Sequence, residues 1–345
     1  MNNVKVSVSI VIPSWNGLHL LKQSIDAMVD AAESYSGECE IIVVDNGSMD
    51  RTVDVLKDYY PDVRIIEFDH NTGFGHACNA GVQNAKHELI LLLNNDIFIP
   101  NSLIQDLVNL FNKTDDCFSV SPRTNLWEDG RLTDKTFSTS INFEFNENAE
   151  LIQQWNVNDF SCLIDEDCKT IYNTGAAMLV DKQKFLELGG FDSVYGLAYW
   201  EDADLCLRAW KKGWPSVVAI NSVAWHQISA SSESSFKDKL PTKTKMMTTN
   251  YIVFQLLHLP DFTHIYKFSR VIRRYMRHLK SSYDADSQKE ISRKVFKLLP
   301  TIIKRRLAER RTSKLNTLII ANNIAVHKDA WKSSPVLEDE IKRDL

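Results

Sequence analysis

The sequence predicts an α/β protein built on a doubly wound, mostly parallel sheet with helices on both faces. Short runs of consecutive apolar residues have the length of strands buried on both faces. Between them lie longer segments whose apolar residues recur at helical spacing, as the crossovers of a parallel sheet require. Two of the predicted strands also end in a carboxylate, Asp45 and Asp96.

The clearest strand covers residues 89–93, where five large apolar residues follow one another. Five residues are too few for a helix that must bury every side, and they fit the middle of a sheet. The run stops at Asn94, Asn95 and Asp96 and resumes briefly over 97–99. The leucine spacing over 103–111 then predicts a helix capped by Asn101 or Ser102.

The remaining elements of the first half follow the same alternation. We expect strands over 4–12, 40–44, 63–68 and 118–121, and helices over 18–29, 53–60 and 76–85. The order β-α-β-α-β-α-β-α-β with short connections predicts right-handed crossovers and one edge on which the strands end.

The second half of the chain is less regular. Between 124 and 170 no periodicity persists, which indicates an irregular functional loop or lid. Beyond it we expect a strand over 175–180, a helix over 182–188 closed by two glycines, a helix over 201–212 and a strand over 217–225.

Composition is that of a globular protein that does not span a membrane. Apolar residues make up 44% and charged residues 25% of the chain, and no apolar run reaches the roughly 18 residues of a span. The N-terminus lacks the basic and then apolar pattern of a signal peptide. Six scattered cysteines without a Cys-x-x-Cys pair favour a reduced, cytosolic protein without structural zinc.

Charge divides the chain near residue 260. Residues 1–260 contain 20 Lys and Arg against 35 Asp and Glu, whereas 261–345 contain 20 against 10. Basic and apolar residues interleave at helical spacing over 265–311. This pattern is typical of a helix on an anionic membrane surface and equally of the solvated face of a packed helix. No fold motif indicates binding to nucleic acid.

Carboxylate side chains lie at the ends of two predicted strands and at the start of one predicted helix. The carboxyl ends of parallel strands line the crevice where α/β proteins bind ligands, which favours a functional edge at Asp45 and Asp96. Ordinary turn chemistry is the alternative. Glu201, Asp202 and Asp204 fall in the first turn of a predicted helix, where acids also suit the helix dipole.

Several short blocks, in this order, resemble the family-2 inverting glycosyltransferases of GT-A fold, especially the rhamnosyltransferase-like branch of bacterial surface-polysaccharide synthesis. The resemblance extends over about residues 7–230. It is carried by the segments Ser9–Asn16, Ile42–Ser48, Asn71–Gly75, Cys78–Gly81, Leu92–Asp96, Gly189–Asp192 and Trp200–Arg208.

The resemblance implies a role for particular residues of this chain. It assigns Asp202 as the catalytic base, Asp96 as a ligand of a divalent cation, and His226 as a second ligand of the metal or of the phosphates. It also implies a nucleotide-sugar site made of Pro13, Ser14, Trp15, Asn16, Asp45, Asn71, Gly73, Asn79, Asn94, Asn95, Trp200 and Glu201.

One position departs from the family pattern. Asn94 stands where the family has the first acid of its Asp-x-Asp motif. A site with one fewer negative charge is expected to hold Mg²⁺ or Mn²⁺ more loosely and to depend on the diphosphate for further ligands.

The resulting hypothesis is an enzyme that transfers a sugar, with rhamnose as one candidate, from a nucleotide diphosphate sugar to a saccharide or lipid-linked saccharide. Residues 1–260 would be the GT-A domain, with a nucleotide-binding half (1–123) and an acceptor and catalytic half (124–260). Residues 261–345 would form a helical basic region. We expect a cytoplasmic location, with peripheral attachment to the inner face of the cell membrane as one form of it.

Two alternatives remain. A sugar-1-phosphate nucleotidyltransferase has a similar sheet but needs a glycine-rich basic loop after the first strand, and residues 14–17 do not provide one. A degenerate, non-catalytic carbohydrate-binding protein is suggested only by Asn94.

Overall fold

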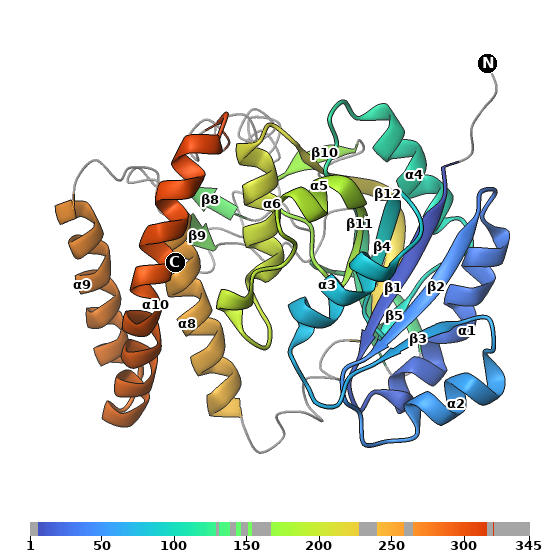
Figure 1. Ribbon diagram of the computed structural model, residues 1–345, viewed down its shortest axis with the longest axis horizontal. Helices are drawn as coiled ribbons and strands as arrows, with labels where there is room; N and C mark the ends of the chain where they lie inside the picture. The colour runs from blue at the N-terminus through green and yellow to red at the C-terminus, as the bar shows by residue number, and fades with distance from the viewer. Residues whose placement is uncertain are drawn as a thin grey trace.

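A computed structural model describes residues 6–128, 131–138, 143–145, 151–153, 167–227, 240–258, 265–315 and 320. Within these residues a ten-stranded sheet runs through the body of the protein, and helices cover both of its faces (Figure 1). A separate group of helices, α8 to α10, stands at one end of the molecule (Figure 1).

The first half of the chain forms four parallel strands in the order β4-β1-β2-β3. The elements are β1 (Val8–Ser14), α1 (Leu18–Ser34), β2 (Cys39–Asp45), α2 (Thr52–Tyr59), β3 (Arg64–Glu67), α3 (Phe74–Asn84) and β4 (Leu89–Leu93). This confirms the predicted alternation. The first strand was expected to end at Pro13, and β1 continues one residue further, so that Ser14 pairs with Asp45.

The second half completes the sheet in a different way. β5 (Ile97–Phe98), α4 (Leu103–Lys113), β6 (Ser119–Glu128), β11 (Ala177–Asp181) and β12 (Ser216–His226) follow in the chain. β11 lies antiparallel between β4 and β6, and β12 runs parallel to β6. The sheet is therefore parallel at one end and mixed at the other.

The segment expected to be irregular contains strands wherever the structure describes it. β6 pairs antiparallel with β7 (Arg131–Ser138), β8 (Phe143–Phe145) pairs with β9 (Leu151–Gln153), and β10 (Cys168–Thr170) pairs with β12. The lack of a hydrophobic period in this segment therefore does not mean a lack of strands. Cross-strand hydrogen bonds hold such hairpins without a hydrophobic period.

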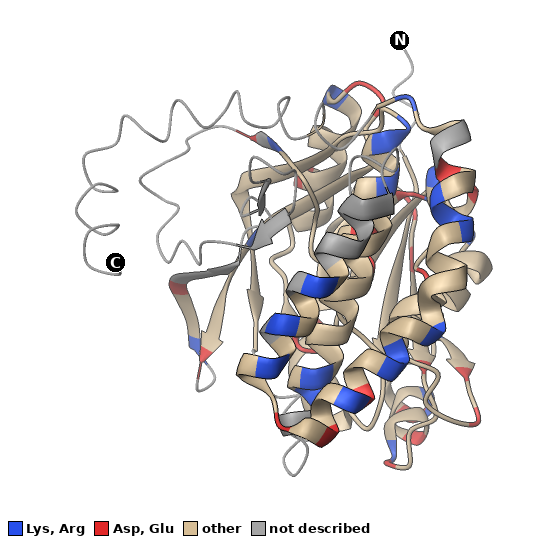
Figure 2. Cartoon of the chain, turned by 90° about the vertical axis from the view of Figure 1, so that its left-hand side faces the viewer, with Lys and Arg blue, Asp and Glu red and all other residues tan. Residues whose placement is uncertain are grey.

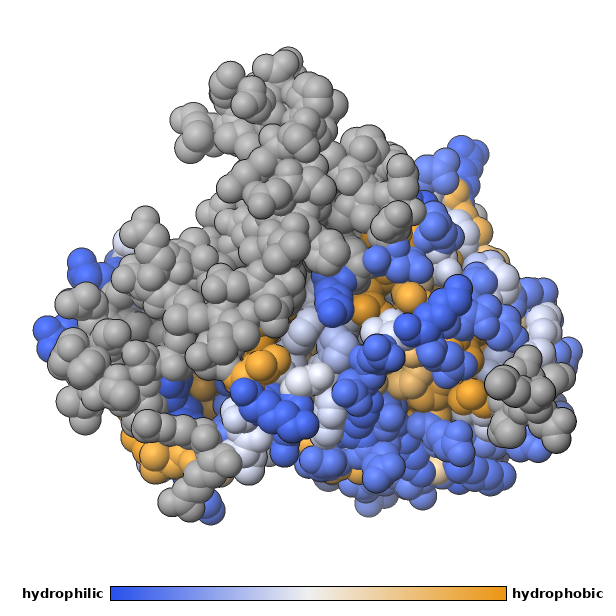
Figure 3. Space-filling view, turned by 90° about the horizontal axis from the view of Figure 1, so that it is seen from above, coloured by the Kyte–Doolittle hydropathy of each residue, from blue (hydrophilic) through white to orange (hydrophobic). Residues whose placement is uncertain are grey.

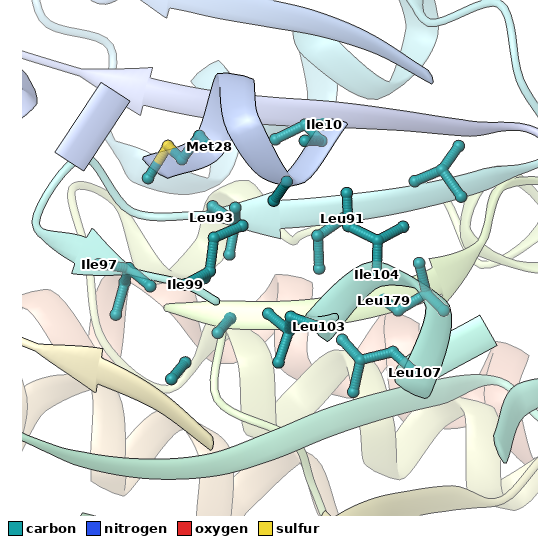
Figure 4. Close-up of a cluster of buried hydrophobic side chains, with 14 of the residues drawn as sticks. Ile10, Met28, Leu91, Leu93, Ile97, Ile99, Leu103, Ile104, Leu107 and Leu179 are labelled. Atoms are coloured by element: carbon teal, nitrogen blue, oxygen red, sulfur yellow. The ribbon is translucent and has the colours of Figure 1, made fainter. Parts of the chain in front are cut away.

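Successive residues of the central strands belong in turn to two different hydrophobic clusters. In β4, Leu91 and Leu93 belong to the cluster under α1 and α4, whereas Ile90 and Leu92 belong to the cluster under α3. Figure 4 shows Leu91 and Leu93 with side chains of α4, including Leu107. Because both faces are covered, the strands are apolar throughout, which explains the signal in the sequence.

A third hydrophobic cluster joins side chains from residues 171–210 to the C-terminal helices. It combines Leu207 of α6 (Glu201–Lys211) with side chains of α8 (Leu240–His258), α9 (Ile265–Ser282) and α10 (Ala285–Thr312). Phe254 of α8 and Ile302 of α10 are fully buried in it. The domain division at residue 260 stays a prediction, and the helices on its two sides share this core.

No helix among the described residues is long and apolar enough to cross a bilayer. Seen from above, most of the described surface is hydrophilic and its hydrophobic areas are small (Figure 3).

Candidate active site

The ends of β1 and β2 place Ser14 beside Asp45. These two residues are neighbours in the parallel register, and each is only 3% exposed. Oδ2 of Asp45 accepts a hydrogen bond from the Ser48 N–H (3.1 Å), while its Oδ1 is buried without a hydrogen-bond partner among the described residues. An unpaired buried carboxylate oxygen is costly and is well suited to a ligand that brings a donor or a cation.

The turn after β4 lies beside this pair. Asn95 donates from Nδ2 to Oγ of Ser14 (2.9 Å), and its carbonyl accepts from Oγ of Ser24 on α1 (2.8 Å). The N–H of Asn94 donates to the carbonyl of Ala176 (2.9 Å), and Oδ1 of Asn94 is a further buried oxygen without a described partner. Ser14, Asp45 and the Asn94–Asp96 turn therefore meet at one edge of the sheet.

Asp96 and His226 come together from distant parts of the chain. β5, directly after Asp96, pairs antiparallel with the end of β12, so that Ile97 faces His226. This register leaves Nε2 of His226 3.2 Å from Oδ1 of Asp96. The carboxylate is 1% exposed and the imidazole 16% exposed.

Asp96 and His226 fit a divalent cation that takes its remaining ligands from a bound substrate. A carboxylate oxygen and an imidazole nitrogen are ligands that Mn²⁺ accepts, and Mg²⁺ accepts the carboxylate. No group of three or more His, Cys, Asp or Glu side chains is arranged for a metal within the described ranges. The remaining ligands would have to be oxygens of the donor diphosphate or water.

Asp202 is tied to the same edge through the segment before β11. Its Oδ2 accepts from the Gly175 N–H (3.1 Å) and its Oδ1 from the Ala203 N–H (2.8 Å). Ala176, next to Gly175, is the residue whose carbonyl accepts from Asn94. Burial raises the pKa of Asp202 above its ordinary value, and these backbone donors oppose that rise.

Glu201 differs from Asp202 in its surroundings. Its side chain is 6% exposed, and Oε2 is buried without a hydrogen-bond partner among the described residues. Burial, together with the negative charge of Asp202, raises the pKa of Glu201 to about 8. At neutral pH Glu201 is therefore mainly protonated.

Asp204, the third acid, belongs to a buried ion-pair network. Its carboxylate lies 2.7 Å from Nε of Arg208 and 2.9 Å from Nε2 of His258, and it accepts from the Tyr195 hydroxyl (3.1 Å). Burial alone would raise the pKa of Asp204, but Arg208 and His258 hold it below its ordinary value. Asp204 therefore has a structural role, which the sequence left open.

A strained turn leads into these acids. Tyr199 and Trp200 have φ angles of 75° and 78°, a conformation that large side chains rarely adopt. Nδ2 of Asn250 in α8 lies within 2.7 to 3.1 Å of the carbonyl oxygens of Tyr195, Ala198 and Tyr199. The Trp200 ring packs on Tyr251 and Phe254 of the same helix. α8 thus holds the turn in place.

Asn71 and Gly73 lie in a loop that contacts Asn46, and Asn79 of α3 contacts Phe191. Oδ1 of Asn71 accepts from Nδ2 of Asn46 (3.1 Å) and from the Gly73 N–H (2.9 Å). Asn79 exchanges two hydrogen bonds with the backbone of Phe191 (2.8 and 2.9 Å). Gly73 has φ 95°, and a Cβ there would lie 2.7 Å from the Gly196 carbonyl. Asn46, the residue after Asp45, thus holds the loop of Asn71 and Gly73 beside the end of β2, and no contact joins Asn79 to Asp45 among the described residues.

A pocket of about 360 Å³ opens between these loops. Its lining includes His70, His76, Asn79, Asp192 and Glu201. Among the acids in the first turn of α6, Glu201 is the one that lines this pocket.

The segment after β1 also takes a defined shape. The N–H of Asn16 donates to Oγ of Ser48 (2.9 Å), and its Oδ1 accepts from the Met49 N–H (2.7 Å). Asn16 has φ 49°. The Trp15 side chain is 37% exposed, and Pro13 is half-buried beside Val44. Trp15 is thus an aromatic surface on which a planar base could stack.

Sequence reasoning missed the residues that hold this site together. Asn46, whose Oδ1 accepts from the N–H and the hydroxyl of Thr72, followed Asp45 in a block that indicated only a turn. Asn250 and His258 lie inside an ordinary helix and have no local signal. Their hydrogen-bond partners are 47 or more residues away in the sequence, so only the folded chain reveals them.

Comparison with known proteins finds a matching family and several similar sequences. The family model for glycosyl transferase family 2 matches residues 9–188, which is more than half of the chain. An uncharacterised glycosyltransferase of Rickettsia typhi is 35% identical over 115 residues, which cover 33% of this chain and 35% of that protein. The undecaprenyl-phosphate 4-deoxy-4-formamido-L-arabinose transferase of Edwardsiella ictaluri is 31% identical over 105 residues, which cover 29% and 32%. The aligned segments thus span about a third of these relatives.

The overall shape is also similar to that of solved glycosyltransferases. A mannosyltransferase from Pyrobaculum calidifontis, in complex with GDP-Man and Mn²⁺, superimposes with a TM-score of 0.52 at 14% identity. The match covers 96% of this chain and 89% of that one. At this identity the likeness concerns the fold, and it confirms the GT-A architecture that the sequence predicted.

Proposed function

The chain belongs to glycosyl transferase family 2, and on that premise we propose that it transfers a sugar from a nucleotide diphosphate sugar to a hydroxyl of a saccharide acceptor, with inversion. The observation that carries the proposal is the convergence of three chemistries at one edge of the sheet. The hydroxyl and carboxylate of Ser14 and Asp45, the carboxylate and imidazole of Asp96 and His226, and the carboxyl group of Asp202 lie around the same strand ends.

The donor would lie along the ends of β1, β2 and β4. The unpaired Oδ1 of Asp45 is suited to accept from a ribose hydroxyl, and the exposed ring of Trp15 is suited to stack on the base. Asp96 and His226 would hold Mg²⁺ or Mn²⁺. Such a cation, when bound, neutralises negative charge on the departing diphosphate.

Asp202 would act as the general base. Its oxygen takes the proton of the acceptor hydroxyl while the hydroxyl oxygen bonds to the anomeric carbon. The bond from that carbon to the diphosphate oxygen breaks, and the nucleoside diphosphate leaves with the electron pair. Attack from the face opposite the leaving group inverts the configuration. The backbone donors at Gly175 and Ala203 keep Asp202 ionised and aimed.

A neutral Glu201 complements this base. Two adjacent ionised carboxylates would repel each other, and the protonated Glu201 avoids that cost while it can donate a hydrogen bond to a bound sugar. We propose that Asp202 accepts the proton and that Glu201 donates a hydrogen bond to the sugar.

The proposal also covers the saccharide acceptor and the location of the enzyme in the cell. We favour a bacterial cell-surface saccharide, free or lipid-linked, and rhamnose as one donor sugar, because of the sequence blocks that resemble the rhamnosyltransferase-like branch. A lipid-linked acceptor would place the enzyme in the cytoplasm at the inner face of the cell membrane. The lipid-phosphate substrate named for the Edwardsiella ictaluri relative agrees with this setting.

The test is donor binding and turnover across a panel of nucleotide sugars with and without Mn²⁺. We expect one donor to bind in a metal-dependent way, and Asp96→Ala to abolish that dependence while the thermal transition persists. Asn109→Ala, an exposed change on α4, is the matched control. Metal-independent binding of every donor, or unchanged turnover in Asp96→Ala, would remove this pair from the site. Binding without any transfer would favour the non-catalytic alternative.

A further inference from the structure

The C-terminal helices divide their positive charge between an inner and an outer side. On the inner side, Arg305 forms an ion pair with Asp192, and Arg306 donates to the carbonyls of Leu256 (2.6 Å) and Leu257 (3.1 Å). These arginines are structural. They fasten α10 to α8 and to the loop after α5.

The outer side of α10 carries both apolar and basic side chains. Phe296, Ile303 and Leu307 are 49%, 38% and 50% exposed, although they are large and apolar. Their spacing of seven and four residues puts them on one side of the helix. That side is distinct from the buried one, which contains Ile291, Val295 and Ile302.

Basic residues flank the exposed apolar row. Arg293, Lys297 and Lys304 are exposed and lie about 60 to 100° around the helix from Phe296. Within the described part of the chain none of the three is in an ion pair, and the sequence has no Asp or Glu from 291 to 308. Figure 2 shows Lys and Arg along the helices on this side of the molecule.

α9 contributes further exposed positive charges. Arg273, Arg277 and Lys280 recur at helical spacing and are exposed. Met276 of α9 contacts Ser292 of α10 (3.5 Å), so the two helices lie side by side.

We propose that the outer side of α10, defined by Phe296, Ile303, Leu307 and the flanking Arg293, Lys297 and Lys304, docks on an anionic lipid bilayer. Half-exposed apolar side chains bordered by unpaired cations match a helix that lies in the interface between headgroups and acyl chains. Nucleic acid would use the cations but would leave the apolar row in water. The proposal does not depend on glycosyl transfer, because vesicle binding requires neither donor nor acceptor.

Point substitutions test this better than deletion. Removal of α9 and α10 would expose the core cluster that they share with α6 and α8. We therefore compare the full chain with the triple variant Arg293→Gln, Lys297→Gln and Lys304→Gln. Its control removes three exposed positive charges elsewhere, at Lys22, Lys86 and Lys113.

A second pair of variants separates the apolar contribution. Phe296→Ser with Leu307→Ser removes two half-exposed side chains from the docking side. The control is Tyr59→Ser with Leu186→Ser, which are 75% and 43% exposed on the body of the protein. All four positions are on the surface, so circular dichroism should show the same fold in each variant.

The measurement is co-sedimentation with vesicles of phosphatidylcholine alone or with 30% phosphatidylglycerol, at several salt concentrations. We expect binding only to the anionic vesicles, weaker at high salt. Each basic residue near such a surface contributes about fivefold in affinity, so the basic triple variant should bind about 100-fold more weakly. Both control variants should bind like the unmodified protein.

Three outcomes would overturn the proposal. The first is no binding of the unmodified protein to anionic vesicles. The second is equal loss in the control and the α10 variants, which would show a general charge effect. The third is self-association that Phe296→Ser with Leu307→Ser abolishes, without vesicle binding, because the row would then be a contact between copies of the chain.

Discussion

Replacement of Asp202 by Asn separates the proton-accepting role of this residue from its structural one. The amide keeps the shape of the side chain but cannot take a proton from the acceptor hydroxyl. Loss of a general base typically costs 10²-fold to 10⁴-fold in rate, and a 10²-fold loss corresponds to about 2.7 kcal/mol of activation free energy. We expect a loss of at least about 10²-fold in turnover.

The contacts of Asp202 limit the accompanying change in stability. Both carboxylate oxygens accept from backbone N–H groups, of Gly175 and Ala203. An amide can accept only once there and turns its NH₂ group toward the other donor, which loses a charge-assisted hydrogen bond of about 1.5–3 kcal/mol. The variant no longer buries a charge, which offsets part of that loss. We therefore expect the free energy of unfolding to fall by about 1–2 kcal/mol.

The assay measures transfer under donor saturation, donor affinity by calorimetry and the free energy of unfolding by urea titration. Donor affinity should stay nearly unchanged, because the donor contacts lie at other residues. In the unmodified enzyme the rate should rise with pH through the raised pKa of Asp202, since only the ionised carboxylate accepts a proton. If Asp202→Asn transfers sugar normally while Glu201→Gln is inactive, the base is Glu201 and the assignment is wrong.

Two further predictions concern the support of the site. Asn250→Ala removes the amide that holds the turn before Glu201, so turnover should fall by about tenfold or more while donor affinity changes little; Asn84→Ala, an exposed change on α3, is the control, and equal kinetics in the two variants would contradict this. The free energy of unfolding should fall at low pH, because Asp204 and His258 are protonated more readily in the unfolded chain. The lowered pKa of Asp204 contributes stability that is present above its unfolded value of 3.8 and is lost as the pH falls below it. Burial, with help from Lys211, lowers the pKa of His258, so protonation of the unfolded chain below pH 6.5 also favours unfolding. Asp204→Asn should flatten the pH dependence of the free energy of unfolding below pH 4, and an unchanged slope there would argue against the network.

The sequence by itself determined the parallel half of the sheet. A strand covered on both faces must be apolar at every position, and this makes β4 visible as Leu89–Leu93. Because parallel strands end on one edge, the sequence also predicts that Asp45 and Asp96 share that edge. The helix at Glu201 was equally clear, from its acids and its closing glycine.

Only the tertiary structure shows how the strands from β6 to β12 are assembled. The antiparallel insertion of β11 and the hairpin of β6 and β7 depend on cross-strand pairing, which has no hydrophobic period in these segments. The three acids of α6 were indistinguishable by composition. Their roles diverge because Asp204 meets His258 from α8, Asp202 meets Gly175, and one oxygen of Glu201 meets no donor among the described residues. Burial and distant partners set the charge of a carboxyl group, and a sequence does not record either until the chain has folded.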